Sequence, residues 1–342
     1  MSGDDECTWF SSAGSPCDEN GNLISLSLRF NNLVGELPGE IALLTYLRSV
    51  DLSENSLFGA LPPSLTDLVY LHSMNFDSNA YERKFPELVT RLTNLRVLSF
   101  SLNRLTGSLP KSISKLTNLE VFSVAANRLT SGIPSDIASM TALRELHLEF
   151  NELSGSIASE LGLLSNLVNL KLDLNLFSSG IPTELGLLLN LRSFSCNDCS
   201  LVGSLPTEMG RLVRLNTFEL QSNQLTGAIP SEIGSATNLR LVDLSSNSFA
   251  GTLPSEVGRL TSISIFDASR NNLTGTLPRE LVSIDSDGFV FYLDNNQLTG
   301  TIPEELCNAL VASQEVITLN GTSVVLCNCS QCHTVSVRRA GG

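Results

Sequence analysis

The chain has 342 residues, of which 42% are hydrophobic and 16% are charged, a balance typical of a folded protein and opposite to that of a disordered one. Its 35 Asp and Glu residues outnumber 21 Lys and Arg residues, giving a net charge of −14. Such an acidic surface repels phosphate backbones, so nucleic acid is not expected as a partner. No stretch approaches the roughly 18 apolar residues that a membrane span requires.

The N-terminal segment, residues 1–22, precedes any periodic pattern and contains Cys7, Trp9 and Cys17. Its first six residues are mostly polar or acidic and lack the basic and apolar regions of a signal peptide. Cysteines nevertheless cluster at both ends of the chain, which is typical of disulfides formed in an oxidising compartment. We therefore expect an extracellular or cell-surface protein whose export signal is not part of this sequence.

Residues 23–306 repeat one pattern, L-x-x-L-x-L-x-x-N-x-L-x-G-x-[IL]-P, about twelve times. Ten of the eleven intervals between the Asn positions are 24 residues long, and the last, which follows the segment 283–288, is 25. We call these positions the ladder and number the repeats by them: Asn31, Asn55, Asn79, Asn103, Asn127, Asn151, Asn175, Cys199, Asn223, Asn247, Asn271 and Asn296. A Pro column runs in phase and is broken once, at Ala158. This period predicts a solenoid, in which each repeat packs only on its neighbours.

The second repeat shows how one unit folds. Its segment 49–53 alternates, with Val50 and Leu52 apolar, and this predicts a short strand with both side chains inward. The later spacing of Leu61, Leu65 and Leu68 is helical or 3₁₀-like. The ladder Asn offers donors and an acceptor to the backbone of the sharp turn after the strand, so we assign it a structural role. The predicted fold class is an α/β repeat solenoid.

These columns resemble the plant-type leucine-rich repeat proteins, most clearly at 225–230 and 298–303. The resemblance implies a curved horseshoe with a concave parallel β-sheet, short second strands at L-x-G-x-[IL]-P, and 3₁₀ turns on the convex side. Members include receptor-kinase ectodomains, receptor-like proteins and polygalacturonase inhibitors. The segment Cys7–Phe10 followed by Cys17 resembles the family's N-terminal cap, although the two cysteines are spaced more widely than usual. We expect a Cys7–Cys17 disulfide.

Residues 307–335 are rich in cysteine, and residues 336–342 form a tail. Cys307, Cys327, Cys329 and Cys332 resemble the ends of algal, diatom-like members. With His333 they also offer zinc-ligand chemistry, but one cluster without a second spaced pair favours a disulfide cap. The pairing among these four cysteines stays open. No metal ion or cofactor is expected.

Cys196 and Cys199 lie inside the repeats with C-x-x-C spacing. In register, Cys196 takes an inward Leu position and Cys199 takes a ladder position. Thioredoxin-like chemistry requires a thiol at a helix N-terminus, whereas this pair follows a strand. We expect two buried, reduced and unreactive thiols.

The concave face is the predicted binding surface, because the curvature of a solenoid creates an extended contact area. Most of its positions are small and polar, but repeats six and seven combine an aromatic residue with mixed charges and a His, as interface hot spots do. These residues are Glu145, His147, Glu149, Phe150, Lys171 and Asp173. A second, weaker cluster joins Tyr292 with Asp267 and Asp294. Because two Glu residues flank His147, we expect binding to vary between about pH 5 and 7.

One glycosylation site is predicted at Asn272, in the sequon Asn272–Thr274, because it follows a ladder Asn and should face solvent. The sequons at Asn320 and Asn328 are weaker candidates. The three histidines form no recognisable triad, and the glycines follow the repeat, not a phosphate loop. An enzyme is therefore not expected.

The sequence favours an extracellular recognition module, a monomer or weak dimer, that binds a protein, peptide or glycan, as the ectodomain of a receptor-like protein would. One alternative is an inhibitor of a secreted hydrolase, which an acidic patch facing a basic enzyme would indicate. Another is an ice-binding surface, but the Thr column that this requires is interrupted at Val34, Phe58 and Glu82.

Overall fold

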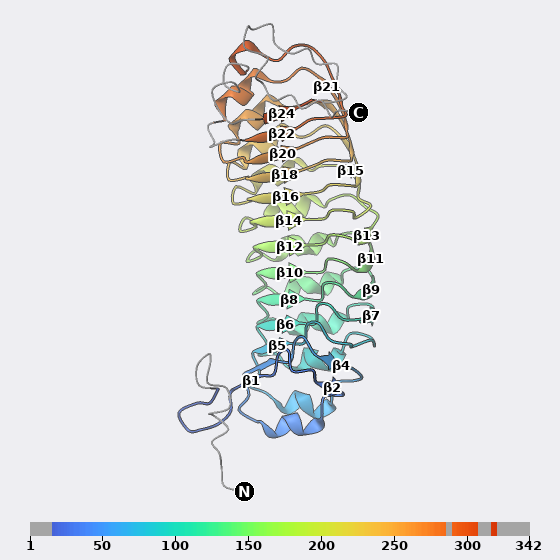
Figure 1. The fold of residues 1–342 in the computed structure, drawn as a ribbon, viewed down its shortest axis with the longest axis vertical. Helices are drawn as coiled ribbons and strands as arrows, with labels where there is room; N and C mark the ends of the chain where they lie inside the picture. The colour runs from blue at the N-terminus through green and yellow to red at the C-terminus, as the bar shows by residue number, and fades with distance from the viewer. Residues whose placement is uncertain (1–15, 285–288, 307–315, 320–342) are drawn as a thin grey trace. The chain divides into compact units, whose positions relative to one another are not determined.

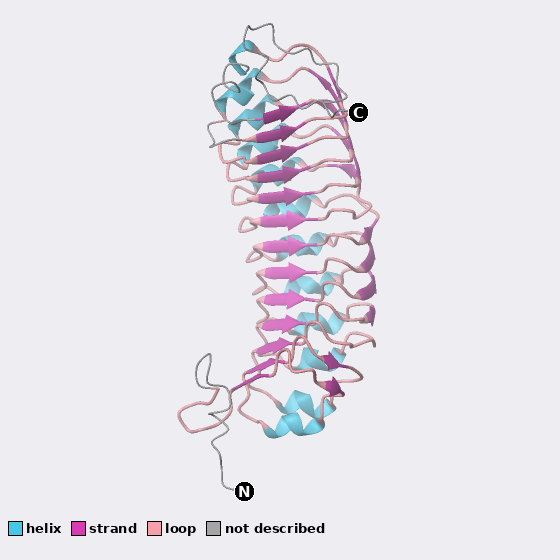
Figure 2. Cartoon of the chain, in the orientation of Figure 1, coloured by secondary structure: helices cyan, strands magenta, loops and turns pink. Residues whose placement is uncertain are grey.

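A computed structural model describes residues 16–284, 289–306 and 316–319 (Figure 1). The first eleven repeats each contribute a short main strand and a 3₁₀ helix, and most of the repeats contribute a second short strand (Figure 2). The chain divides into two compact units, residues 1–153 and 154–342, which are described in turn. In the described residues, no helix has the length and apolar character needed to cross a membrane.

The first unit contains six parallel main strands, and within this unit each strand pairs with the one a repeat later. Ser25 is opposite Ser49, and Val50 is opposite Met74. Val50 and Leu52 are buried, which confirms the strand predicted for the second repeat. The strands are β1 (Ser25–Ser27), β3 (Ser49–Asp51), β5 (Ser73–Asn75), β6 (Val97–Ser99), β8 (Val121–Ser123) and β10 (Glu145–His147).

Second strands in this unit form two separate groups. One group pairs β2 (Val34–Gly35) with β4 (Ser56–Leu57), and the other pairs β7 (Thr106–Gly107), β9 (Arg128–Ser131) and the start of β11 (Glu152–Gly155). Repeat three, between them, has no second strand and makes only an isolated bridge from Lys84 to Thr106. The 3₁₀ helices are η2 (Gly39–Leu43), η3 (Pro63–Asp67), η4 (Glu87–Arg91), η5 (Lys111–Lys115) and η6 (Ser135–Ser139).

The Pro column explains where these helices begin. Pro38, Pro62, Pro110 and Pro134 each occupy the N-cap with an extended backbone. Proline has no N–H to leave unpaired and its φ is fixed near −65°, so it directs the chain into the first turn at no hydrogen-bonding cost.

The second unit repeats the same arrangement. Its parallel main strands are β12 (Asn169–Lys171), β14 (Ser193–Ser195), β16 (Thr217–Glu219), β18 (Leu241–Asp243), β20 (Ile265–Asp267), β22 (Val290–Tyr292) and β24 (Val316–Thr318). The second strands are β13 (Leu176–Phe177), β15 (Val202–Ser204), β17 (Gln224–Gly227), β19 (Ser248–Thr252), β21 (Asn272–Gly275) and β23 (Gln297–Leu298). The 3₁₀ helices run from η7 (Ser159–Leu163) through η8 (Thr183–Leu187), η9 (Thr207–Arg211), η10 (Ser231–Ser235) and η11 (Ser255–Arg259) to η12 (Arg279–Ser283). Strand β24 lies within the predicted C-terminal cap and continues the main sheet there.

The ladder has the structural role predicted for it. In repeat four, Asn103 Nδ2 donates to the carbonyl oxygens of Phe76, Phe100 and Ser101 at 2.9–3.1 Å. Its Oδ1 accepts from the backbone N–H of Tyr81, at 3.1 Å. One side chain therefore ties its own turn to the preceding repeat. The core behind the ladder is filled by Leu, Ile and Phe, including Phe76 and Phe100, whose rings stack with centroids 5.2 Å apart.

Candidate ligand-binding surface

The main strands place one set of side chains toward solvent. In β10, Leu146 is fully buried, while Glu145 and His147 on either side of it lie on the opposite face. This follows from the two-residue period of a strand. The same alternation in every repeat produces a surface made of the first and third residues of each main strand and of the turn before each ladder position. We call this the strand surface.

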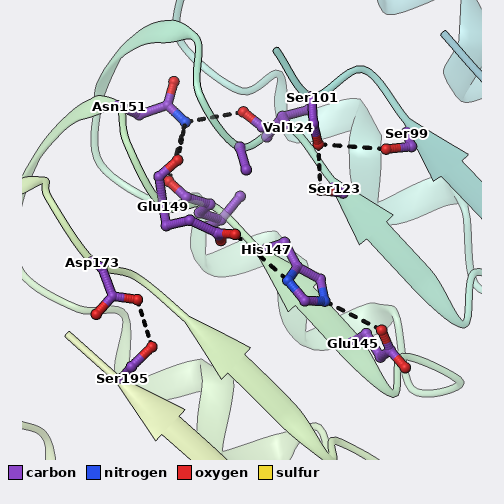
Figure 3. A network of polar contacts seen from close by, with 12 residues as sticks. Ser99, Ser101, Ser123, Val124, Glu145, His147, Glu149, Asn151, Asp173 and Ser195 are labelled. Atoms are coloured by element: carbon purple, nitrogen blue, oxygen red, sulfur yellow. Dashed lines mark hydrogen bonds and ion pairs between the residues drawn. The ribbon is translucent and has the colours of Figure 1, made fainter. Parts of the chain in front are cut away.

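In the first unit, three predicted residues meet on the strand surface (Figure 3). His147 Nε2 lies 3.2 Å from Glu145 Oε2, and His147 Nδ1 lies 3.8 Å from Glu149 Oε1. Only 18% of the His147 side chain is exposed. A carboxylate oxygen therefore lies near each ring nitrogen of His147. We call Glu145, His147 and Glu149 the histidine cluster.

Glu149 has one unpaired oxygen. Oε2 is buried and has no hydrogen-bond partner among the described residues, whereas Oε1 faces His147. An unpaired buried carboxylate oxygen costs free energy. A ligand that brought a donor to Glu149 would recover part of that cost.

Phe150 follows this cluster and is 55% exposed, as predicted. Its φ of +57° places it in the left-handed region, like the residue before every ladder position. The turn therefore fixes the direction of the Cα–Cβ bond of Phe150. The same column carries exposed Phe30 and Leu102 in the first unit and exposed Leu174 in the second. Sequence reasoning missed these three, although the column one residue before the ladder would have revealed them.

Lys171 and Asp173 lie in the second unit and do not have equivalent roles. The Asp173 carboxylate accepts hydrogen bonds from the Ser195 hydroxyl and from the Asn197 backbone N–H. It therefore has partners within the protein. Lys171 is opposite Ser195, which in turn is opposite Glu219 on the next strand. Burial and two Asp residues raise the pKa of Glu219, and the positive charge of Lys171 lowers it by a smaller amount.

Three carboxylates form an acidic row along adjacent strands of the second unit. Glu219 is opposite Asp243, and Asp243 is opposite Asp267, so like charges face one another directly. Burial, followed by repulsion from Asp173 and Asp243, raises the pKa of Glu219. Burial, with smaller repulsion from Asp243 and Asp294, raises the pKa of Asp267. Like charges directly opposite destabilise a sheet, so the row has an unfavourable electrostatic energy that a cationic partner would relieve.

The second predicted cluster adjoins this row. Asp267 is opposite Tyr292, whose side chain is partly exposed, and the Asp294 carboxylate accepts from the Thr318 hydroxyl. Sequence reasoning identified these residues but missed Glu219 and Asp243 as members of a row. Both lie in the column four residues before the ladder, whose positions were interpreted from the sequence as mostly small and polar.

The interior cysteines correct one prediction. Cys196 and Cys199 are fully buried, as expected, but they are joined by a disulfide and are not free thiols. The geometry of the turn explains the bond. In other repeats, the turn places the ladder side chain against the carbonyl oxygen of the residue three positions earlier. In this repeat, it places the Cα atoms of Cys196 and Cys199 5.6 Å apart, a distance that a disulfide spans. Cys199 Sγ lies 3.2 Å from the Leu172 carbonyl oxygen, but a disulfide sulfur has no hydrogen to donate.

The structure describes only some of the residues in the predicted cap disulfides and the predicted glycosylation site. Cys17 is buried, and its backbone pairs with that of Leu23 in an isolated antiparallel β-bridge. The other cysteines of the two predicted caps lie outside the described residues, so their disulfides stay predictions: Cys7, Cys307, Cys327, Cys329 and Cys332. Asn272 begins β21 and is exposed, as a glycosylation site requires. Within the described residues, no group of His, Cys, Asp or Glu is arranged to hold a metal ion.

Comparison with known proteins agrees with this architecture. The leucine-rich repeat family model matches residues 22–44, 46–68, 94–116, 142–164, 238–260 and 290–309. Among curated proteins, none matches the sequence significantly. The matched segments together with the parallel main strands and repeating 3₁₀ turns show that the chain is built of leucine-rich repeats.

Solved structures give the clearest likenesses. A TDR receptor is 31% identical with a TM-score of 0.82, and the plant peptide hormone receptor RGFR1, in complex with RGF2, is 25% identical with a TM-score of 0.73. In each case the match covers 89% of this chain and 56% of the receptor chain, so this chain spans little more than half of their length. A leucine-rich repeat protein of Leptospira interrogans, LIC12759, is 28% identical with a TM-score of 0.71, over 85% of this chain and 70% of that one.

Proposed function

We propose that this leucine-rich repeat protein is an extracellular recognition module of the plant receptor-like type that binds a peptide or protein ligand on its strand surface. The observation that carries the proposal is the grouping of exposed Phe150 with the histidine cluster. The similarity to a peptide hormone receptor in complex with its peptide supports this class of ligand.

The chemistry of the site fits such a ligand. Phe150 offers an exposed apolar contact on a turn whose backbone is already ordered, so little backbone entropy is lost when it is covered. The neighbouring carboxylates provide acceptors for backbone N–H groups or for cationic side chains, and one oxygen of Glu149 has no partner within the described residues. An aromatic anchor beside polar groups is the usual composition of an interface hot spot.

The test is a selection of peptides on the immobilised protein, followed by calorimetry with Phe150→Ala. We expect most selected peptides to lose about tenfold to thirtyfold in affinity, since truncating a central aromatic anchor typically costs about 2 kcal/mol. Leu43→Ala is the matched control, because Leu43 is an exposed apolar side chain in η2, away from the main strands. Ser99 is unsuitable as a control, because it is buried and donates to Asp77.

If peptides are selected but none depends on Phe150 more than on Leu43, the placement of the site is wrong. The failure to select any peptide or protein ligand, from libraries and from extracellular extracts, would count against recognition itself. Peptides that depend on the second unit instead would move the site to the acidic row.

A second candidate, inhibition of a basic secreted hydrolase, is favoured by the acidic row. In this case affinity should depend steeply on ionic strength, since exposed charges are screened by salt. Inhibition assays against secreted hydrolases, with Asp243→Asn as the variant, distinguish it from peptide recognition. The variant should weaken inhibition of a basic enzyme while leaving peptides bound at Phe150 unaffected.

A further inference from the structure

Repeat three departs from the repeat pattern at three closely spaced positions. Tyr81 replaces the Leu or Phe found two residues after the other ladder positions, and Phe85 replaces the Leu or Ile found six residues after them. Arg83 stands where nine other repeats have a glycine with positive φ. This is the repeat of the first unit that lacks a second strand, between β4 and β7 (Figure 1).

A cavity opens at this gap. Its volume is about 140 Å³, and its walls come from repeats two to four: Gly59, Ala60, Leu61, Tyr81, Arg83, Lys84, Pro86, Leu88 and Leu105. Most of these side chains are apolar. An apolar cavity of roughly 150 Å³ is large enough to hold a benzene ring. The space therefore suits a single ring or a branched aliphatic group, and not a folded peptide segment.

Two cations border the cavity without carboxylate partners. Arg83 and Lys84 are exposed, and neither forms an ion pair within the described residues. The side chain of Glu36 lies against Gly59, but Glu36 does not line the cavity. In a chain of net charge −14, two adjacent unpaired cations at the edge of an apolar cavity favour an anionic ligand group.

Tyr81 contributes a third, independent feature. The residue is 3% exposed, its ring is held by edge contacts with Phe76 and Phe100, and its hydroxyl is buried with no hydrogen-bond partner among the described residues. Burial raises the pKa of the Tyr81 hydroxyl far above its ordinary value, so the group stays protonated and able to donate. A buried donor without an acceptor is costly, and a Phe at this position would avoid that cost.

We propose that the repeat-three cavity binds a small carboxylic acid, with its aromatic or branched apolar body among Leu61, Leu88 and Leu105 and its carboxylate toward Arg83, Lys84 and the Tyr81 hydroxyl. This site is separate from the strand surface and does not depend on the proposed function. It gives a reason for two of the three departures in repeat three, because Tyr81 and Arg83 both line the cavity.

Benzoate is a suitable probe, with benzamide as its uncharged analogue and acetate as an anion without an apolar body. We expect calorimetry or ligand-observed NMR on the full chain to detect benzoate at millimolar or lower concentration and to find at least fivefold weaker binding of both analogues. Added salt should weaken the binding of benzoate and not that of benzamide, because salt screens charges at an exposed border. No binding of benzoate at 10 mM (about the weakest useful affinity for so small a ligand), or equal binding of benzamide, overturns the proposal. Equal binding of acetate shows a simple anion site and overturns it as well.

The variants separate the groups that we assign. Arg83→Gln combined with Lys84→Gln should weaken benzoate binding at least fivefold, whereas the charge-matched control, Arg104→Gln with Lys111→Gln, should leave it unchanged. Equal losses in both would show a general effect of net charge and would overturn the assignment of the two cations. Unfolding midpoints confirm that each variant is folded.

Tyr81→Phe tests the hydroxyl without removing the ring. We expect benzoate binding to fall about tenfold, the scale of one hydrogen bond to a charged group, while the ligand-free protein keeps or gains thermal stability. A merely structural tyrosine would give the opposite combination of lower stability and unchanged affinity. That result would remove Tyr81 from the site.

Discussion

Replacing Asn127 by alanine tests the energetic role of the ladder. Asn127 is buried, its Oδ1 accepts from the Leu105 N–H at 2.8 Å, and its Nδ2 donates to the carbonyl oxygens of Phe100, Val124 and Ala125 at 2.8–3.2 Å. The variant Asn127→Ala removes all four contacts at once. Their contributions are unequal, because the backbone groups differ in what else they can bind.

The three carbonyl oxygens each keep a second donor. Phe100 O also accepts from Asn103 Nδ2, Val124 O from Asn151 Nδ2, and Ala125 O from the Leu102 N–H. Losing the two N–H donors of Asn127 therefore costs about 1 kcal/mol in total, at the low end of the range for hydrogen bonds. The Leu105 N–H, by contrast, is left buried without this acceptor, which costs about 2 kcal/mol. The sum predicts a destabilisation of about 3 kcal/mol.

Chemical denaturation of Asn127→Ala measures this difference, with Asn118→Ala as the control in the same repeat. Asn118 is exposed and makes one hydrogen bond, from its Nδ2 to the Thr93 carbonyl oxygen, so its loss should cost less than 1 kcal/mol. Equal destabilisation by the two variants would refute the reasoning that the acceptor role of the ladder dominates.

Two further predictions follow. Cys196 and Cys199 should resist alkylation in denaturant until a reductant is added, because the bond joins them; labelling without reductant, detected by peptide mass spectrometry, would restore the free thiols expected from sequence. Asp267→Asn should raise the thermal unfolding midpoint slightly at pH 7. Burial raises the folded-state pKa of Asp267 above 3.8, so its charged form opposes folding at neutral pH and this cost disappears as the pH falls through that raised value. The gain from the variant should therefore vanish near pH 4, and a gain that persists there would assign it to packing instead.

The repeat pattern predicted most of the fold because its inward columns have few chemical solutions. A buried apolar column, a Pro at the N-cap and an Asn at the turn each follow from local packing or hydrogen bonding, and the structure confirms them in repeats such as those of Asn103 and Asn127. The disulfide was not predicted, because the sequence assigned inward positions to Cys196 and Cys199 but not the distance across the turn between them.

The binding surface was harder to predict, because the exposure and the hydrogen-bond partners of each side chain depend on residues in neighbouring repeats. Asp173 and Glu219 look alike in the sequence, yet Asp173 accepts two hydrogen bonds from repeat eight, whereas Glu219 is half-buried beside other carboxylates. The contrast arises from residues 22 and 24 positions away from Asp173. The members of the acidic row share one column of the sequence, but the sequence does not show that Glu219 and Asp267 are partly buried beside other carboxylates.

The repeat pattern shows which residue types the fold requires at each position, so a position that departs from the pattern stands out. A ladder Asn replaced by Cys199 coincides with a disulfide, and a glycine replaced by Arg83 coincides with a missing second strand and a cavity. Two departures in repeat three bring no gain to an ordinary repeat: Arg83 stands in a repeat that lacks the second strand of its neighbours, and Tyr81 buries a hydroxyl without a partner among the described residues. Selection for stability alone would favour the regular residues at both positions. Departures that carry such a cost are therefore where a function beyond the scaffold should be sought first, and in this chain the strongest of them lies in repeat three.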